Sequence, residues 1–100
     1  MVKHIILWNL KSTYSEEEKQ SIREGIKEGL EGLQGKIPGL LDIRVNITRL
    51  ESSTADLMLD ATFEDEAALK AYSGHPEHVK VADGRVRPYT ELRRCLDFII

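Results

Sequence analysis

The residues best suited to chemistry are histidines, and two of the three lie in one short stretch, Tyr72–Val79, with the sequence YSGHPEHV. Gly74 can adopt the left-handed conformation that ends a helix, and Pro76 is tolerated only in the first turn of a following helix. His75 should therefore lie in a joint and His78 on a new first turn, where free backbone N–H groups and a positive helix end gather. This setting disfavours imidazole protonation and suits an anionic or polar ligand. The stretch indicates a site without naming a reaction.

Other kinds of site find no support in the sequence. His75 and His78 are three residues apart, and no cysteine or nearby histidine completes a zinc-binding set, so we expect no metal site. No serine is framed by the G-x-S-x-G pattern, and Cys95 lies in a predicted strand, so a nucleophilic hydrolase is not indicated. Phosphate-cradling glycine patterns are also absent. We expect no cofactor.

Length and composition limit the classes of protein to which the chain can belong. The chain of 100 residues suits one domain, residues 1–100, and 41% hydrophobic with 31% charged residues describe an ordinary globular protein. A formal net charge of −3 without a basic face argues against nucleic acid as a partner. The apolar run from Ile5 to Trp8 is too short to span a membrane, and the single cysteine, Cys95, cannot form an internal disulfide. We therefore expect a cytoplasmic protein with no membrane partner.

The order of predicted elements indicates the fold class. Strand, helix, strand, strand, helix and strand follow one another, which is typical of an α+β, ferredoxin-like sandwich with helices on one face of an antiparallel sheet. Ser15 and Glu18 have the spacing of a capping box and set the first helix start. The predicted elements are the strand Val2–Lys11, a helix from Ser15 to Gly35, the strands Leu41–Leu50 and Ala55–Phe63, a helix over Glu66–Tyr72, a weakly helical stretch Glu77–Val86 broken at Gly84, and the strand Arg94–Ile100.

Three glycines, Gly25, Gly29 and Gly32, lie inside the first predicted helix. Each weakens a helix by roughly 1 kcal/mol relative to alanine. The glycines therefore indicate either that this helix packs very close to the sheet or that this turn is mobile, and we favour close packing.

The first and last strands are apolar on both faces. Two helices can cover only one face of the sheet, and a bare second face would expose an apolar patch larger than the roughly 300–600 Å² usual for monomers. A second copy of the chain is the simplest cover, so we predict a homodimer whose two sheets enclose a barrel-like interior. In the first strand, one face carries His4, Ile6, Trp8 and Leu10, and the other carries Ile5 and Leu7.

Two aspartates interrupt otherwise apolar strands. An unpaired buried carboxylate is costly, so Asp60 and Asp97 should each face the barrel rim, meet an arginine such as Arg44, or bond a histidine. The sequence does not indicate which aspartate does which.

The chain resembles the stress-responsive α/β-barrel domain proteins, often called Dabb proteins, over nearly its whole length. The most specific match is Ala71–Val79, which has that family's tyrosine, His-Pro pair and following histidine at the expected spacings. The other matching segments are Val2–Trp8 for the first strand, Lys36–Gly39 for a turn, Ala55–Leu59 for the third strand and Arg94–Phe98 for the last strand.

The resemblance implies a ferredoxin-like fold and a barrel-forming homodimer, but not one activity. The family includes plant polyketide cyclases, which close a poly-β-keto chain by an aldol reaction without cofactor or metal. In those enzymes a tyrosine before the His-Pro pair and the second histidine act in the pocket, and the corresponding residues here are Tyr72 and His78. The first-strand histidine is present as His4. A neutral imidazole can remove a proton beside a carbonyl while a phenol donates to the developing enolate, so the residue types fit.

We therefore predict Tyr72 and His78 as catalytic residues in a pocket that His4 joins if its strand face lines the barrel interior. His75 is expected mainly to hold the joint. Tyr72 and His4 also have a structural interpretation, as core residues with bonded polar atoms. The predicted ligand-binding residues are His4, Trp8, His75 and Asp60.

Two classes of function remain open. The first is a stress-responsive barrel protein of unassigned activity that binds a small molecule. The alternative is a cofactor-free acid–base enzyme, polyketide cyclase-like or an isomerase, that acts on a small carbonyl compound. A cavity beside Tyr72 and His78 would favour the enzyme, whereas a barrel filled by side chains would favour a non-catalytic protein.

Overall fold

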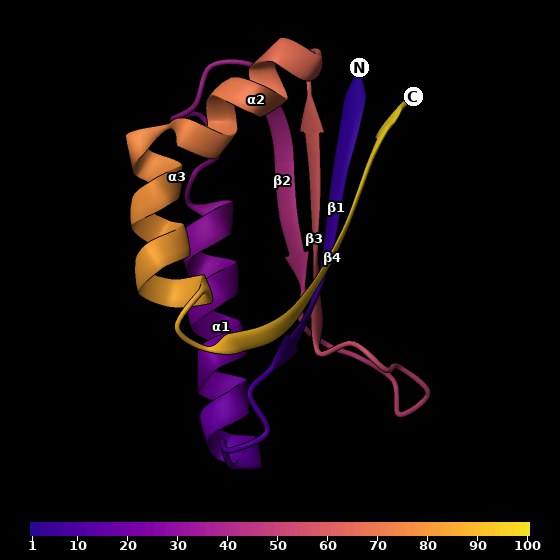
Figure 1. Cartoon of the computed structure of the whole chain (residues 1–100), viewed down its shortest axis with the longest axis vertical. Helices are drawn as coiled ribbons and strands as arrows, with labels where there is room; N and C mark the ends of the chain where they lie inside the picture. The colour runs from indigo at the N-terminus through magenta and orange to yellow at the C-terminus, as the bar shows by residue number, and fades with distance from the viewer.

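A computed structural model describes residues 1–100 and shows a four-stranded antiparallel sheet with the helices on one face (Figure 1). The strand order is β2-β3-β1-β4, so the first and last strands of the chain lie side by side. This arrangement confirms the predicted ferredoxin-like fold. In chain order the elements are β1 (Val2–Leu10), α1 (Glu16–Glu31), β2 (Leu40–Asn46), β3 (Leu57–Phe63), α2 (Glu66–Gly74), α3 (Pro76–Val81), a π-helical segment η1 (Ala82–Val86) and β4 (Thr90–Ile99).

Side-chain caps define where the two main helices begin, as the sequence predicts. The Glu18 N–H donates to the Ser15 hydroxyl at 3.1 Å, and the Ser15 N–H donates to the Glu18 carboxylate at 2.9 Å, which completes a capping box. Asp65 accepts from the Ala68 N–H at 2.8 Å at the start of α2.

No helix in the structure is both long and apolar enough to span a lipid bilayer.

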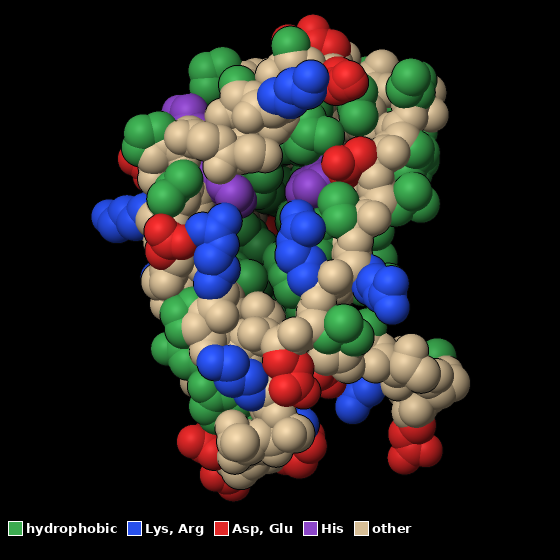
Figure 2. All heavy atoms as spheres, in the orientation of Figure 1, with side chains coloured by type: hydrophobic (Ala, Val, Ile, Leu, Met, Phe, Trp, Pro, Cys, Tyr) green, Lys and Arg blue, Asp and Glu red, His purple; other side chains and the backbone are tan.

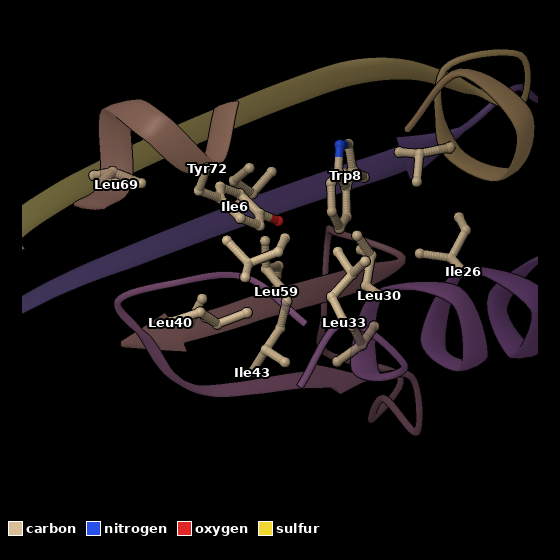
Figure 3. Packing of buried hydrophobic residues seen from close by; sticks show 14 of the residues in the cluster. Ile6, Trp8, Ile26, Leu30, Leu33, Leu40, Ile43, Leu59, Leu69 and Tyr72 are labelled. Carbon is tan, nitrogen blue, oxygen red and sulfur yellow. The ribbon is translucent and has the colours of Figure 1, made fainter. Parts of the chain in front are cut away.

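The core lies between the helices and the sheet face that carries His4, Ile6 and Trp8. Figure 3 shows Trp8 of β1 and Tyr72 of α2 among leucines and isoleucines from both layers. Ile26 and Leu30 of α1 are buried there, together with Leu59 of β3. This apolar layer holds β1 and α2 in fixed relation.

The structure corrects the predicted alternation in β2. The sequence pattern places Leu41 inward, but the register shifts so that Leu40 pairs with Phe63 and Asp42 pairs with Thr62. Leu41 is the extra residue of this bulge and is 43% exposed, whereas Leu40 is buried. Strand pairing ends at Asn46, so the predicted extension to Leu50 is wrong.

The C-terminal third also differs from the prediction. Gly84 does not break the helical stretch, because η1 continues directly from α3 through this residue. Strand β4 begins at Thr90 rather than Arg94, and pairs with β1 as far as Leu10. A hydrophobicity pattern does not reveal this longer strand, because its first part contains the polar residues Glu91, Arg93 and Arg94.

The two edges of the sheet differ. Edge strand β2 is covered by α1: Lys27 donates to the Val45 carbonyl at 2.8 Å, and Glu31 accepts from the Val45 N–H at 2.9 Å. Gln34 makes a second pair of bonds to Leu41 and Ile43. These side chains occupy backbone groups that could otherwise pair with another strand. Strand β4 is the edge without such cover.

The second face of the sheet lacks helices and exposes apolar side chains. The register of β1 with β4 places Leu7, Leu96 and Phe98 on this face, where they are 40%, 63% and 39% exposed. Leu92 of β4 lies there too. This is the face for which a second copy of the chain is the predicted cover.

The predicted close approach of a helical glycine occurs, but against helix α3 and η1 rather than against the sheet. A Cβ atom on Gly29 would lie 2.9 Å from Val81 Cγ1 and 2.8 Å from Arg85 Cδ. A Cβ atom on Gly25 would meet nothing within 4 Å. Gly29 therefore lets the two helices touch, whereas Gly25 has no such role.

These two glycines give a matched pair of variants. Gly25→Ala should raise the free energy of unfolding by about 0.5–1 kcal/mol, because alanine has the better helix propensity and its methyl group has space. Gly29→Ala should lose this gain and destabilise the protein, because Val81 and Arg85 must move. Denaturant unfolding of both variants measures the difference. Equal stabilisation by the two alanines would contradict close packing at Gly29.

Candidate functional site

A pocket of about 170 Å³ lies between the sheet and the helical layer. Figure 2 shows it as a hollow with hydrophobic side chains at its base, histidine at one end and basic side chains beside it. Its apolar lining includes Ile6, Trp8, Leu30 and Leu59. Its polar lining residues are His4, Tyr72, Ser73, His78, Arg87, Thr90 and Arg93.

Tyr72 and His78 meet in this pocket, as the sequence predicts. Tyr72 lies near the end of α2 and His78 in the first turn of α3, and their ring centroids are 4.1 Å apart. The chain turns between the helices at His75, whose backbone is extended at φ −67° and ψ 133°. Gly74 does not adopt a positive φ, so the prediction of a left-handed glycine there is wrong. The restriction that Pro76 places on the residue before it produces the turn instead.

His4 joins the same pocket from β1. Its ring centroid lies 6.1 Å from that of Tyr72, and the residue is buried. The predicted location needs one correction, because the His4 face of the sheet is covered by the protein's own helices. The pocket therefore lies within one chain, between its sheet and its helices, and not in a space enclosed by two sheets.

The proton positions on both histidines follow from their partners. His78 Nδ1 lies 3.2 Å from the Ser73 carbonyl, which can only accept, so Nδ1 carries the hydrogen and Nε2 has the lone pair. His4 Nδ1 lies 2.5 Å from the Asp97 carboxylate, which fixes the same tautomer when His4 is neutral. Burial lowers the pKa of His78, and the charges of Arg87, His4 and Arg93 lower it further against the opposing Ser73 bond. His78 is therefore a neutral imidazole at neutral pH.

The Tyr72 hydroxyl is buried and has no hydrogen-bond partner in the protein. Burial raises the pKa of Tyr72 above its ordinary value, against a smaller opposing effect of the Arg93 charge. The phenol therefore stays protonated and can act only as a neutral donor or acceptor. An unpaired buried hydroxyl costs about 1–3 kcal/mol, so this atom marks a place where a partner is missing.

The remaining predicted site residues separate into three positions. Trp8 is buried and lines the pocket. His75 lies at the joint, where its Nδ1 accepts from the Glu77 N–H at 3.1 Å and caps α3. Asp60 lies on the opposite sheet face and pairs with Lys3 at 2.9 Å, so it is not a pocket residue, and Arg44 pairs instead with Asp42.

Asp97, Arg93, Thr90 and Arg87 are the site residues that sequence reasoning did not assign. The prediction that an interrupting aspartate bonds a histidine is confirmed for Asp97, but its choice over Asp60 depends on strand register. His4 pairs with Asp97 and Trp8 pairs with Arg93 across the β1–β4 ladder. The alternation within β4 contains a signal for these positions, but only once its register with β1 is known.

His4, Cys95 and Asp97 could in principle supply metal ligands, since their donor atoms lie within 4.8 Å of one another. Ligand atoms around a tetrahedral zinc ion are about 3.3 Å apart or more, from bonds of about 2.0–2.3 Å. The 2.5 Å between His4 Nδ1 and Asp97 Oδ1 is a hydrogen-bond distance. Burial and Asp97 also raise the pKa of the Cys95 thiol, which keeps it protonated. The geometry is that of a hydrogen-bonded pair beside a thiol.

The fold and site together define a ferredoxin-like protein with a polar pocket between its sheet and its helices. The family model for the stress-responsive A/B barrel domain, Dabb, matches residues 2–100, and the chain belongs to this family. A comparison with curated proteins finds no match.

Solved structures support the same assignment. A dimeric protein of unknown function with a ferredoxin-like fold from Bacteroides fragilis is 31% identical, with a TM-score of 0.92 over 99% of this chain and 95% of that one. A dimeric ferredoxin-like protein of unknown function from Thermobifida fusca is 20% identical, with a TM-score of 0.78 over 99% and 90%. Hydroxynitrile lyase from Passiflora edulis is 19% identical, with a TM-score of 0.72 over 99% and 92%. The dimeric neighbours support the predicted homodimer.

The cap at the joint predicts that His75 acts mainly on stability. His75→Ala should lower the free energy of unfolding by about 1 kcal/mol, because the first turn of α3 loses its side-chain acceptor. His75→Asn should restore most of the loss, because asparagine is a good N-cap residue. Denaturant unfolding measures both variants. A His75→Ala protein as stable as wild type would show that the cap contributes nothing.

The buried position of His78 predicts a particular pH dependence. Its folded-state pKa lies below the ordinary value of about 6.5, so the folded protein takes up this proton less readily than the unfolded chain. The resulting contribution to stability is present above about pH 6.5 and is lost as pH falls towards the lower folded-state pKa. An NMR titration of the His78 ring should give a midpoint below 6.5. A midpoint above it would contradict the buried, neutral imidazole.

Proposed function

We propose that this protein is an acid–base enzyme that acts on a small carbonyl compound bound between Tyr72, His78 and His4. The single observation that carries the proposal is the Tyr72 hydroxyl, which is buried without a partner at the wall of a pocket. Such a group is satisfied when a ligand oxygen accepts its hydrogen bond. Beside it stands His78, whose tautomer leaves Nε2 as the available base.

The arrangement supports proton abstraction next to a carbonyl group. The carbonyl oxygen of the substrate would accept from the Tyr72 hydroxyl, and His78 Nε2 would remove the proton from the adjacent carbon. The electron pair of that C–H bond moves into an enolate, whose oxygen keeps the Tyr72 hydrogen bond. Protonated His78 then returns the proton to the same or another atom. The whole sequence transfers only protons and needs no cofactor.

His4 has a second role in this proposal. Its Nδ1 hydrogen is held by Asp97, so its Nε2 is also available as an acceptor. His4 and His78 thus approach Tyr72 from different elements, β1 and α3. A substrate between them can lose a proton to one ring and exchange a second proton with the other. This geometry suits isomerisation as well as aldol chemistry.

The pocket volume limits the substrate. A cavity of about 150 Å³ accommodates one benzene molecule, so 170 Å³ suits a compound of roughly ten non-hydrogen atoms or fewer. A long poly-β-keto chain would not fit within this pocket alone. The structural neighbour from Passiflora edulis, a hydroxynitrile lyase, shows that a ferredoxin-like scaffold of this shape occurs in an enzyme. For this chain we favour a small ketone or aldehyde.

The second candidate function is a non-catalytic protein that binds a small molecule in the same pocket, for example in a stress response. The unpaired Tyr72 hydroxyl also fits this function, because a bound carbonyl would satisfy it without reacting. The two candidates differ in what happens to the carbon beside the carbonyl. Only the enzyme would make the hydrogen atoms on that carbon exchange with solvent faster than they do in buffer alone.

Tyr72→Phe tests the proposal because it should affect stability and activity differently. The activity to measure is deuterium incorporation beside the carbonyl of small ketones such as 2-butanone and cyclohexanone, followed by proton NMR in heavy water. Loss of the hydroxyl should lower the exchange rate by about 10²–10³-fold. The free energy of unfolding should stay the same or rise, because an unpaired buried hydroxyl is removed.

Tyr14→Phe is the matched control, because Tyr14 contacts Tyr89 away from the pocket. It should leave the exchange rate unchanged. His78→Gln should abolish exchange while retaining the folded spectrum. If exchange survives both Tyr72→Phe and His78→Gln, these residues are not the catalytic pair. Saturable ketone binding without any exchange would favour the binding protein.

A further inference from the structure

The arginines among the lining residues of the pocket are not matched by an acidic lining residue. Arg87 and Arg93 line it together with Thr90, and no aspartate or glutamate is among its lining residues. Basic side chains beside the hollow are visible in Figure 2, close to the histidine side chains. Cationic groups at a partly enclosed pocket favour a ligand with negative charge.

The two arginines differ in their partners. Arg87 forms an ion pair with Asp83 one helical turn earlier, so its charge is balanced within the chain. Arg93 forms no ion pair, and its polar neighbour is the Cys95 thiol. The nearest acidic residue on its strand face, Asp97, is bonded to His4. Arg93 is thus the cation in the pocket that has no anion.

Strand register places Arg93 on the sheet face that lines the pocket. Arg93 pairs with Trp8, so it shares the helix-side face with His4 rather than the open face. It also lines a second, larger cavity between α2 and β4, which His4 and Asp97 line too. The positive charge of Arg93 lowers the pKa of both Tyr72 and His78, which line the same pocket.

From this placement we propose that the substrate carries a carboxylate, which the Arg93 guanidinium binds with help from the Thr90 hydroxyl. The substrate class is then a small oxo acid, with its carbonyl at Tyr72 and its carboxylate towards β4. A guanidinium suits this role because it presents two parallel N–H donors to a carboxylate. The sequence predicts a preference for anions at the start of α3, but His75 already caps that helix end. This inference rests on the proposed function for the orientation of the carbonyl group.

The test compares an oxo acid with a neutral molecule of nearly the same shape. The probes are 4-oxopentanoate and 4-oxopentanamide, with 2-oxopropanoate as a shorter acid, and binding is followed by NMR titration of the backbone amides around Tyr72. Wild-type protein should bind 4-oxopentanoate roughly 10- to 100-fold more tightly than the amide, the range expected for hydrogen bonds between charged groups. The preference should fall as salt is added.

Arg93→Gln and Arg94→Gln form a matched pair. Both remove one positive charge from β4, but Arg94 pairs with Leu7 and faces the open side of the sheet. Arg93→Gln should remove the preference for the acid, whereas Arg94→Gln should keep it. The backbone spectra confirm that each variant is folded. Equal affinity of wild type for acid and amide, equal losses in the two variants, or no binding of either acid at millimolar concentration would overturn the inference.

The outcomes also separate this inference from the proposed enzyme. Arg93-dependent binding of 4-oxopentanoate without deuterium exchange would support the carboxylate site and reject the enzyme. Tyr72-dependent exchange of 2-butanone without any advantage for the acid would support the enzyme and overturn the carboxylate site. Faster exchange in 4-oxopentanoate than in its amide, lost in Arg93→Gln, would support both.

Discussion

The pairing of β1 with β4 is the constraint on which the site depends. It joins the two ends of the chain, with Val2 opposite Ile99, and it sets Asp97 beside His4 and Arg93 beside Trp8. A shift of one residue would turn Asp97 and Arg93 to the open face and bring Arg94 and Leu96 inward, because side chains alternate along a strand. The apolar layer behind Ile6 and Trp8 fixes β1 and therefore the register. The polar groups of the pocket are in place only when the whole chain is folded.

The helical side of the site depends on local chemistry instead. Pro76 and the capping His75 end α2 and start α3 within two residues, which brings His78 against Tyr72. Gly29 allows α1 to contact the segment that continues α3, so the helical layer closes over the sheet. Strand pairing thus positions the pocket residues that come from the sheet, and the turn at Pro76 positions those that come from the helices.

This division explains how much could be predicted from the sequence. The joint, the Ser15 and Asp65 caps and the proximity of Tyr72 to His78 follow from residues close in sequence. The partner of His4, the position of Arg93 and the early start of β4 depend on pairing between residues 80 or more positions apart, which local patterns do not fix. The bulge at Leu41 does not follow from the sequence, because the alternation there is regular and only the pairing of Leu40 with Phe63 shows the extra residue.

The proposed chemistry and the predicted assembly involve opposite faces of the sheet. The pocket lies on the helix side, whereas Leu7, Leu96 and Phe98 lie on the open side where a second copy is predicted to pack. Edge strand β2 is occupied by Lys27 and Glu31 of α1, which leaves β4 as the edge available for association. Each copy in such a dimer keeps a pocket made from its own residues. Substitutions on the open face should therefore act on assembly before they act on the pocket.

The proposed site requires the buried Tyr72 hydroxyl to donate a hydrogen bond to an oxygen atom of a ligand. A high-resolution crystal structure of the protein with 4-oxopentanoate measures this most directly. We expect the ketone oxygen to lie within hydrogen-bond distance of the Tyr72 hydroxyl, about 2.5–3.0 Å, with His78 Nε2 facing the adjacent carbon. A Tyr72 hydroxyl bonded to another protein group, in a pocket closed to the ligand, would contradict it.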